Sequence, residues 1–276
     1  MKADETSAQP PFALLATAHI SMAITHLLLD IEGTTCPVSF VADVLFPYAR
    51  QRLGPYLADH AGEDDIALLV RDVWTVWRDD QHPEARALLE QVHAEPADRS
   101  PAEEATAVVP YLSWLIDHDI KVTALKDLQG RIWRDGYSSG AIVAPLFADV
   151  PQALKDWHQQ GLVLAVYSSG SVPAQQLLYG HSQAGDLRSL FSHWFDTRTG
   201  AKQEPASYTA IAASMGCDPA QVLFISDALA ELEAADRAGL AVIFSDRPGN
   251  PGRDSGSFER INDYNQLRVN NDERRS

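Results

Sequence analysis

Cysteine is scarce in this 276-residue chain, which contains only Cys36 and Cys217. Two cysteines exclude a disulfide-rich scaffold and a zinc site built from cysteines, and they fit a reducing cytosol. Basic residues are also in the minority, because 22 lysines and arginines stand against 38 acids and give a formal net charge of −16. This acidic excess disfavours nucleic acid and anionic membranes as main partners. An anionic substrate would therefore have to be held by a local cation.

Long apolar runs are absent too, since no stretch approaches the roughly 20 residues that a membrane-spanning helix needs. The apolar run at 12–18 is short for a signal peptide, and Asp4 and Glu5 before it fit export or organelle import poorly. We therefore expect a cytoplasmic protein whose residues 1–21 form a flexible extension. A hydrophobic content of 45% is typical of a globular chain, and the length fits about two domains or one α/β domain with an insertion.

Short apolar runs that end in small or acidic residues predict buried strands. These runs lie at 27–29, 162–167, 222–225 and 240–244. Continuous apolar runs are typical of parallel strands that are covered on both faces.

Helical patterns between the later runs complete the prediction of fold class. They lie at 172–179, 205–215 and 228–238, and Gly216 and Gly239 are placed to end the last two. Repeated strand and helix order predicts an α/β fold, an open parallel sheet with flanking helices. Ligands of such sheets bind beyond the carboxyl ends of the strands.

The stretch 38–136 contains amphipathic helical patterns and no obvious buried strand. The patterns lie at 41–53, 66–77, 102–116 and 122–133, with a loop expected at 91–101. We therefore predict a helical cap inserted after the first strand. The expected cap core includes the tryptophans Trp74, Trp77, Trp114 and Trp133. The predicted division is an extension at 1–21, a core at 22–37 and 137–262, a cap at 38–136 and a polar tail at 263–276.

Two acids follow the first apolar run directly, in the segment 30–35 that reads DIEGTT. A carboxylate at a strand end can attack phosphorus covalently, and a second acid two residues on can reach the same ligand. An acid at a strand end is nevertheless more often a turn or a helix cap. Asp30 and Glu32 are therefore candidates whose role depends on the rest of the chain.

A hydroxyl-rich turn, Ser168-Ser169-Gly170, follows the second run and precedes a helical pattern. Hydroxyls and backbone N–H groups at the start of a helix favour a bound phosphate, although serine also caps many helices for structural reasons. Lys202 lies in the loop before the helical pattern at 205–215. A lysine there can neutralise phosphate charge, although most loop lysines are only solvated.

Asp227 ends the third run, and Glu231 lies four residues further along. Oxygen ligands from Asp30 and Asp227, completed by phosphate and water, describe a Mg²⁺ site rather than a zinc site. His181 and His193 are twelve residues apart, which matches no compact metal-ligand spacing, so we expect His181 to fix a loop.

The order of these groups resembles the haloacid dehalogenase-like superfamily of phosphohydrolases, whose core is such a parallel sheet. More narrowly, the chain is similar to the enolase-phosphatases of methionine salvage, also called acireductone synthases. The matching segments are DIEGTT at 30–35, LQGRIW at 128–133, YSSGSV at 167–172, GHS at 180–182, FDT at 195–197, GAK at 200–202, ASY at 206–208 and SD at 226–227. Glu32 is informative, because most phosphatases of the superfamily have aspartate there.

The resemblance implies a role for each candidate. Asp30 would be the nucleophile and a Mg²⁺ ligand, Glu32 would belong to the metal and acid/base group, and Asp227 would complete the metal site, with one Mg²⁺ per chain. The implied phosphate-binding residues are Ser168, Ser169, Gly170 and Lys202, of which Lys202 would also bridge phosphate and nucleophile.

The resemblance also implies a substrate, 2,3-diketo-5-methylthiopentyl-1-phosphate, which is enolised and then dephosphorylated to the acireductone. The cap would exclude water and supply a pocket for the methylthio tail, near Lys126, Gln129 and Trp133, although such residues more often serve packing. The segment SDALAE at 226–231 departs from the superfamily, which often has glycine before the aspartate and another aspartate four residues later. The role of Glu231 therefore stays open.

Three other functions fit parts of this pattern. They are a phosphatase of another small sugar or diketone phosphate, a metal-free dehalogenase that uses the same aspartate, and a catalytically silent binding module. The cap could close without a second subunit, so we expect a monomer whose partner is a small phosphate ester.

Overall fold

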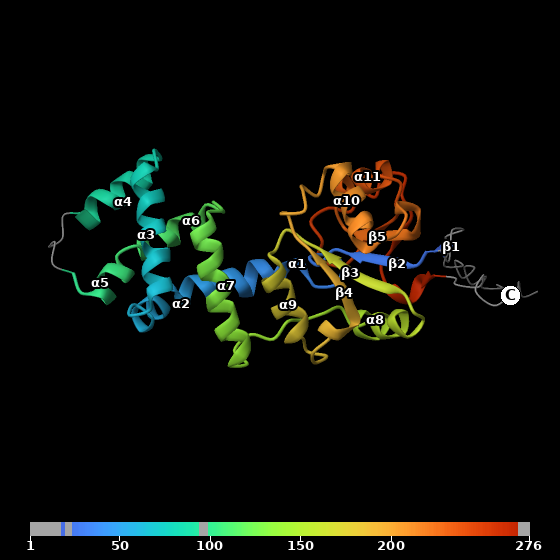
Figure 1. The fold of residues 1–276 in the computed structure, drawn as a ribbon, viewed down its shortest axis with the longest axis horizontal. Helices are drawn as coiled ribbons and strands as arrows, with labels where there is room; N and C mark the ends of the chain where they lie inside the picture. The colour runs from blue at the N-terminus through green and yellow to red at the C-terminus, as the bar shows by residue number, and fades with distance from the viewer. Residues whose placement is uncertain (1–17, 20–23, 94–98, 270–276) are drawn as a thin grey trace, which may run out of the picture.

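A six-stranded sheet forms one end of the elongated molecule shown in Figure 1. The structure is a computed structural model that describes residues 18–19, 24–93 and 99–269. All pairs in this sheet are parallel, in the order β4-β3-β2-β5-β6-β7. The strands are β2 (His26–Leu29), β3 (Val163–Tyr167), β4 (Phe191–Phe195), β5 (Val222–Ser226), β6 (Ala241–Ser245) and β7 (Arg260–Ile261). The predicted α/β fold with an open parallel sheet is confirmed.

Helices cover both faces of the sheet, which explains why its central strands are apolar throughout. Leu27 and Leu29 pack into one hydrophobic cluster and Leu28 packs into another, on the opposite face. The first face is covered by α8 (Val150–Gln159) and α9 (Val172–Gly180), and the second by α10 (Pro205–Met215) and α11 (Leu229–Arg237). Gly216 ends α10 with a φ of 73°, as its predicted role requires.

The sequence patterns did not reveal β4 and α8. β4 reads FSHWF and lies at the edge of the sheet, where Ser192 is exposed, so it lacks a continuous apolar run. α8 buries one stripe of side chains between charged and amide residues, and the stripe consists of Val150, Ala153, Leu154 and Trp157.

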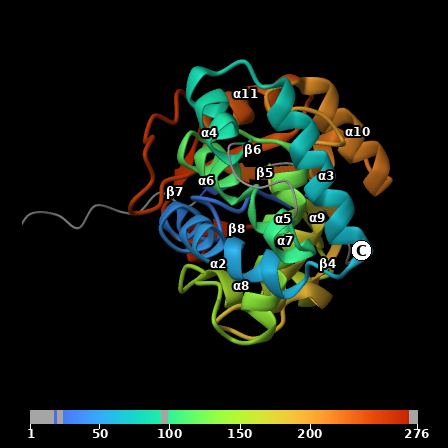
Figure 2. The same ribbon diagram turned by 90° about the vertical axis from the view of Figure 1, so that its left-hand side faces the viewer.

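The segment between β2 and β3 forms a helical region with its own hydrophobic cluster. A first turn, α1 (Val38–Phe40), continues through a π-helical stretch (Val41–Leu45) into α2 (Phe46–Asp59). The other helices are α3 (Asp64–Asp79), α4 (Pro83–His93), α5 (Pro101–Thr106), α6 (Val109–Asp117) and α7 (Thr123–Ser138). Figure 2, viewed from this end, shows most of them in front of the sheet. Within the described residues, no helix has the length and hydropathy to span a membrane.

Two expectations about these helices need correction. α4 continues to His93, into the loop predicted at 91–101, of which residues 94–98 lie outside the described part. The single helix predicted at 102–116 is instead broken between Thr106 and Val109. Pro110 explains the break, because proline lacks a backbone N–H and restricts the residue before it, so it favours the start of a new helix.

Three of the four tryptophans predicted in the cap core are buried there, and Trp133 lies at its edge. Trp74, Trp77 and Trp114 are buried in the cap cluster, and Trp77 stacks on both Trp74 and Tyr111. Trp133 is half-buried between the cap cluster and the cluster of the first sheet face, and its indole N–H donates a 2.8 Å hydrogen bond to the Leu45 carbonyl.

The polar tail begins later than residue 263. Tyr264 is 2% exposed and donates a 3.2 Å hydrogen bond to the Thr34 carbonyl, in the loop after β2. Beyond it, β8 (Leu267–Arg268) pairs in parallel with β1 (Ala18–His19), inside the extension expected at 1–21. The rest of that extension (1–17, 20–21) and of the tail (270–276) lies outside the described residues.

A buried ion pair joins this C-terminal segment to the loop before α8. The Arg247 guanidinium donates two hydrogen bonds, of 2.9 and 2.8 Å, to the two carboxylate oxygens of Asp149. Both side chains are at most 6% exposed, and the guanidinium lies against the rings of Phe147 and Tyr264. Asp149 also accepts the backbone N–H of Tyr264 at 2.7 Å, so one carboxylate orders two segments that are far apart in sequence.

We expect Arg247→Met to lower the free energy of unfolding by about 3–5 kcal/mol, because it leaves a buried carboxylate without its cation. Chemical denaturation measures this change. Arg188→Met is the matched control, since the Arg188–Asp186 pair is half-exposed and such pairs contribute little. Equal losses in the two variants would show that the buried pair has no special structural importance.

Candidate active site

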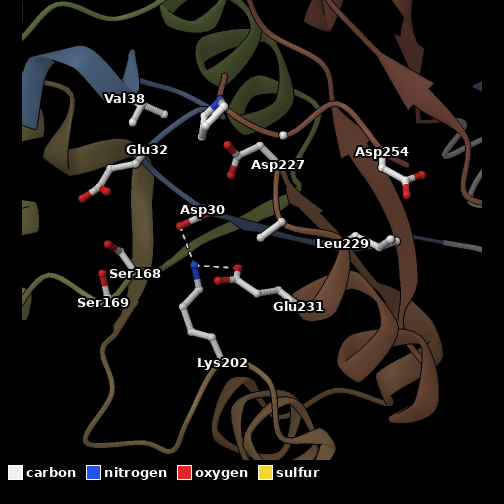
Figure 3. Close-up of a pocket in the computed structure, with 13 residues that line it drawn as sticks. Asp30, Glu32, Val38, Ser168, Ser169, Lys202, Asp227, Leu229, Glu231 and Asp254 are labelled. Carbon is white, nitrogen blue, oxygen red and sulfur yellow. Dashed lines mark ion pairs between the residues drawn. The ribbon is translucent and has the colours of Figure 1, made fainter. Parts of the chain in front are cut away.

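The candidate residues lie at the carboxyl ends of the three central strands. β2, β3 and β5 end directly before Asp30, before Ser168 and before Asp227. These strands are neighbours in the order β3-β2-β5, and the chain reverses its direction of winding at β2, which is where open α/β sheets bind ligands. The side chains line a cavity of about 490 Å³ (Figure 3). Every predicted catalytic, phosphate-binding and metal-binding residue except Gly170 lines it.

A tight loop after β2 directs Glu32 into this cavity. The Ile31 carbonyl accepts hydrogen bonds from the backbone N–H groups of Thr34, Thr35 and Cys36, at 2.9 to 3.2 Å. The Gly33 N–H donates to the Cys36 carbonyl at 2.8 Å. Gly33 adopts a φ of +70°, a conformation that glycine reaches at little cost.

The Asp227 carboxylate packs directly against Gly33. A Cβ atom at position 33 would lie 2.1 Å from Asp227 Oδ2 and 2.5 Å from its Cγ, far inside contact distance. The absence of a side chain at Gly33 therefore lets the loop after β2 and the loop after β5 meet.

We expect Gly33→Ala to reduce phosphate release about 10- to 100-fold, the range found when groups that orient metal ligands are disturbed. The reason is that the new methyl group would displace the Asp227 carboxylate. Gly140→Ala is the matched control, because Gly140 has a φ of +75° and open space around its Cβ position. Steady-state rates and thermal unfolding of both variants measure the effect; equal rate losses would contradict a specific role of the contact.

Lys202 contacts two carboxylates at once. Its Nζ lies 2.7 Å from Asp30 Oδ1 and 2.7 Å from Glu231 Oε2, and its side chain is 10% exposed (Figure 3). Burial disfavours the charged ammonium, but Asp30 and Glu231 outweigh it and raise the pKa of Lys202 above its usual range. Lys202 is therefore a fixed cation beside Asp30.

Aromatic hydroxyls order the loop that carries this lysine. Tyr208 donates a 2.6 Å hydrogen bond to the Lys202 carbonyl, and Tyr167 donates a 2.9 Å hydrogen bond to the Gly200 carbonyl. Both tyrosines are buried in the cluster of the second sheet face. The loop is thus attached to the core on either side of the ammonium group.

Glu231 belongs to the site, which sequence reasoning had left open. Besides its ion pair with Lys202, it accepts a 3.0 Å hydrogen bond from the Ser226 hydroxyl, which also lies 3.3 Å from Asp30 Oδ2. Glu231 lies in the first turn of α11, directly after the loop that holds Asp227. Its position four residues after Asp227 was the one feature of the sequence that pointed to Glu231. Nothing in the sequence indicated that the Ser226 hydroxyl would lie between Glu231 and Asp30.

Acidic groups outnumber basic ones in the cavity. Among the described residues, its lining includes five acids and one lysine. Burial, with repulsion from Asp30 and Glu231, raises the pKa of Asp227 to about 7. Burial and the charge of Asp30 raise the pKa of Glu231 to about 7, although Lys202 acts to lower it. Burial and Asp30 also raise the pKa of Glu32. The carboxylates would be stabilised by an added cation.

The chemistry of these donors fits Mg²⁺. The Asp30 and Asp227 side chains offer hard oxygen atoms, and the Asp227 carboxylate faces the cavity beside Asp30 (Figure 3). No group of three or more His, Cys, Asp or Glu side chains within the described residues is arranged as a metal cage. Mg²⁺ does not need such a cage, because it is commonly held by one or two carboxylates together with water and substrate phosphate.

The turn after β3 presents groups suited to an anion. The buried Ser168 hydroxyl accepts a 3.1 Å hydrogen bond from the Gly170 N–H, so its own proton is free to point at a ligand. Ser169 is exposed at the cavity wall. The turn leads into α9, whose Val172 N–H donates to Asp196 Oδ2 at 3.2 Å.

The cap contributes little to this cavity. Val38 lines it, whereas Lys126, Gln129 and Trp133 do not. Gln129 is buried in α7 and Lys126 is exposed, so the expectation that they surround a substrate tail stays a prediction. The His181 carbonyl accepts the Ala144 N–H at 3.0 Å and its ring packs on Tyr137, and the expectation that His181 fixes the loop stays a prediction.

Comparison with known proteins agrees with this geometry. A family model described as haloacid dehalogenase-like hydrolase matches residues 24–239. A protein of Synechococcus sp. (strain RCC307) called Enolase-phosphatase E1 is 52% identical over 229 residues, which are 83% of this chain and 88% of that protein. A protein of the same name from Prochlorococcus marinus (strain MIT 9313) is 47% identical over 88% of this chain and 98% of its own. The crystal structure of UTR4 protein from Saccharomyces cerevisiae superposes with a TM-score of 0.66 at 35% identity, over 88% of this chain and all of that one.

Proposed function

The chain belongs to the haloacid dehalogenase-like hydrolases, and we infer from its site that it is an enolase-phosphatase of that family. As such it is a phosphoric monoester hydrolase. We propose that it converts 2,3-diketo-5-methylthiopentyl-1-phosphate to acireductone and phosphate in methionine salvage, in the cytoplasm and as a monomer. The observation that carries the proposal is the Lys202 ammonium fixed between Asp30 and Glu231, at the strand ends that also present Ser168 and Asp227.

In the proposed phosphatase step, the Asp30 carboxylate attacks phosphorus and forms an aspartyl-phosphate, while the bond from phosphorus to the C1 oxygen of the substrate breaks and that oxygen takes a proton from Glu32. Asp30 Oδ1 accepts the Ile31 N–H at 2.8 Å and the Lys202 ammonium at 2.7 Å, which fixes the carboxylate and leaves Oδ2 as the less constrained oxygen. Lys202 and the Ser168–Gly170 turn stabilise negative charge on the phosphoryl oxygens as attack proceeds. Water then attacks phosphorus and gives a proton to Glu32, and the bond from phosphorus to Asp30 breaks, which releases phosphate and restores the carboxylate.

Asp30 and Asp227 are the proposed Mg²⁺ ligands, with Glu32 beside them and one ion per chain. When bound, Mg²⁺ supplies the positive charge that allows an anionic carboxylate to approach an anionic ester. The contact between Asp227 and Gly33 keeps the two loops that carry these groups together.

The preceding enolisation needs a base near C1 of the substrate and an electrophile at the neighbouring carbonyl. Burial raises the pKa of Glu32, which makes this carboxylate a better proton acceptor than an exposed glutamate. Lys202 has the charge to stabilise an enolate oxygen. These two residues are the candidates for proton transfer and charge stabilisation in this step.

One experiment tests the whole proposal. The purified protein is incubated with the diketone phosphate and Mg²⁺, and enol absorbance and phosphate release are followed separately. We expect enol to appear before phosphate, and a chelator to stop phosphate release until Mg²⁺ is added back. Phosphate release from other sugar phosphates but not from this one would overturn the substrate assignment, and chelator-insensitive turnover would overturn the metal assignment.

A further inference from the structure

Two buried carboxamides hold two of the loops that form the site, the loop after β2 and the turn after β3. Asn250 is 8% exposed, and its Nδ2 donates to the carbonyls of Gly33 and Ser245 at 2.9 and 3.2 Å. Gln175 is 1% exposed, and its Nε2 donates 2.8 Å hydrogen bonds to the carbonyls of Gly170 and Phe195. In both cases one carbonyl belongs to a site loop and the other to the last residue of a strand, β6 or β4.

The two carbonyl partners fix the orientation of each carboxamide. If the group were turned over, its oxygen would face two carbonyl oxygens, which cannot donate. Asn250 Oδ1 and Gln175 Oε1 are consequently buried, and neither has a hydrogen-bond partner among the described residues. A buried polar atom without a partner costs stability. An apolar side chain of similar size would avoid that cost but would leave two carbonyls without this donor, so the amide is needed at each position for the two hydrogen bonds that it donates.

Asn250 lies where the loop after β2, which carries Asp30, meets Asp227. Its Oδ1 would be 2.9 Å, and Asp227 Oδ2 2.1 Å, from a Cβ atom at Gly33. The two oxygens thus approach the same point above Gly33, while the NH₂ group of Asn250 and the Ser245 hydroxyl both donate to the Gly33 carbonyl, at 2.9 and 3.1 Å. Movement of Asn250 would change the distance between the loop that carries Asp30 and the carboxylate of Asp227.

Gln175 acts on the other half of the site. It holds the carbonyl of Gly170, whose own N–H donates to the Ser168 hydroxyl. The same amide group holds the Phe195 carbonyl, which also accepts the Ser168 N–H at 3.2 Å. Gln175 therefore holds the carbonyls of Gly170 and Phe195, two residues that each form a hydrogen bond with Ser168.

We propose that Asn250 and Gln175 are separate positioning residues of the site, Asn250 for the carboxylates that would hold Mg²⁺ and Gln175 for the turn that would hold phosphate. This assignment rests on the proposed function. It predicts that loss of either amide damages one half of the site and spares the other, because the two amides contact different loops.

The test uses Asn250→Leu and Gln175→Met, which keep approximate size and charge but remove the NH₂ donors. Isothermal titration calorimetry of the full chain measures binding of Mg²⁺ alone, and then of inorganic phosphate at saturating Mg²⁺. We expect Asn250→Leu to weaken Mg²⁺ binding about 10-fold, the lower end of the range for groups behind metal ligands, with phosphate binding unchanged within about 3-fold. Gln175→Met should show the reverse pattern, and each variant is the control for the other.

Thermal unfolding of both variants separates this role from a general loss of structure, which would weaken both ligands together. If either variant fails to fold, Asn250→Ser and Gln175→Thr replace it, because they retain a hydroxyl donor on a shorter side chain. Each should weaken binding of the same ligand, Mg²⁺ or phosphate, by a smaller factor. If the folded variants lose affinity for both ligands equally, or lose none, the assignment of Asn250 and Gln175 is wrong, but the proposed function still stands. Failure of the unaltered chain to bind either ligand would overturn the proposed function and this assignment with it.

Discussion

Asp30→Asn is expected to abolish phosphate release while leaving the fold intact. The carboxamide has almost the same shape, and its oxygen can still accept the Ile31 N–H and the Lys202 ammonium that bond Asp30 Oδ1. It is a far poorer nucleophile than a carboxylate, so turnover should fall by at least about 10⁴-fold, the scale that follows loss of a covalent nucleophile. Phosphate release under saturating substrate and Mg²⁺ measures the effect.

Two controls make this result interpretable. Thermal unfolding of Asp30→Asn should stay close to that of the unaltered protein, and Asp186→Asn, at a half-exposed surface pair, should keep full activity. A trap for aspartyl-phosphate, beryllium fluoride, should be retained by the unaltered chain and not by Asp30→Asn. Substantial turnover of the variant would remove the covalent step from the mechanism.

Lys202→Ala is expected to lower the rate about 100-fold or more, the loss typical of a single donor that stabilises a transition state. The ammonium is buried and fixed by two carboxylates, so water cannot easily replace it. Its removal would also leave Asp30 and Glu231 close together without their shared cation. Initial rates of phosphate release, with substrate varied, would separate a loss in kcat from a weaker KM.

The matched control is Lys155→Ala, which removes an exposed lysine of α8 outside the cavity and should not change the rate. Lys202→Arg is a second comparison, because the larger planar guanidinium keeps the charge but does not reproduce the two short contacts of Nζ. A near-normal rate in Lys202→Ala would reduce Lys202 to a structural cation between two acids.

The sheet was predictable where its strands are buried on both faces. The runs at 27–29, 162–167 and 222–225 are continuous and apolar because helices cover both sides of the strands, and each matches a strand closely. β4 has one open edge and mixes polar with aromatic residues, so neither run length nor alternation marks it. The chemistry of Pro110 favours a helix break at this position. The apolar residues on both sides of Pro110 nevertheless keep helical spacing, and this spacing predicted one continuous helix.

The site residues that directly follow a buried strand were predictable from the sequence. Asp30, Ser168 and Asp227 were identifiable because parallel strands bring their carboxyl ends to one edge. The partners of these groups come from side chains whose direction the sequence does not encode. The link from Glu231 to Lys202, and the amide groups of Asn250 and Gln175, depend on the twist of the sheet and on loops that lie next to each other only in the folded chain.

The pairing of β1 with β8 brings the two ends of the described chain side by side, and both lie on the sheet half of the molecule (Figure 1). The cap, by contrast, is inserted between β2 and β3, which are also neighbours, and α8 lies between the cap and β3. A protein fused directly before Ala18 or after Arg268 would therefore start on the side remote from the cap helices. The same pairing suits circular permutation of the described chain, with a linker that joins Arg268 to Ala18 and new ends opened in a cap loop.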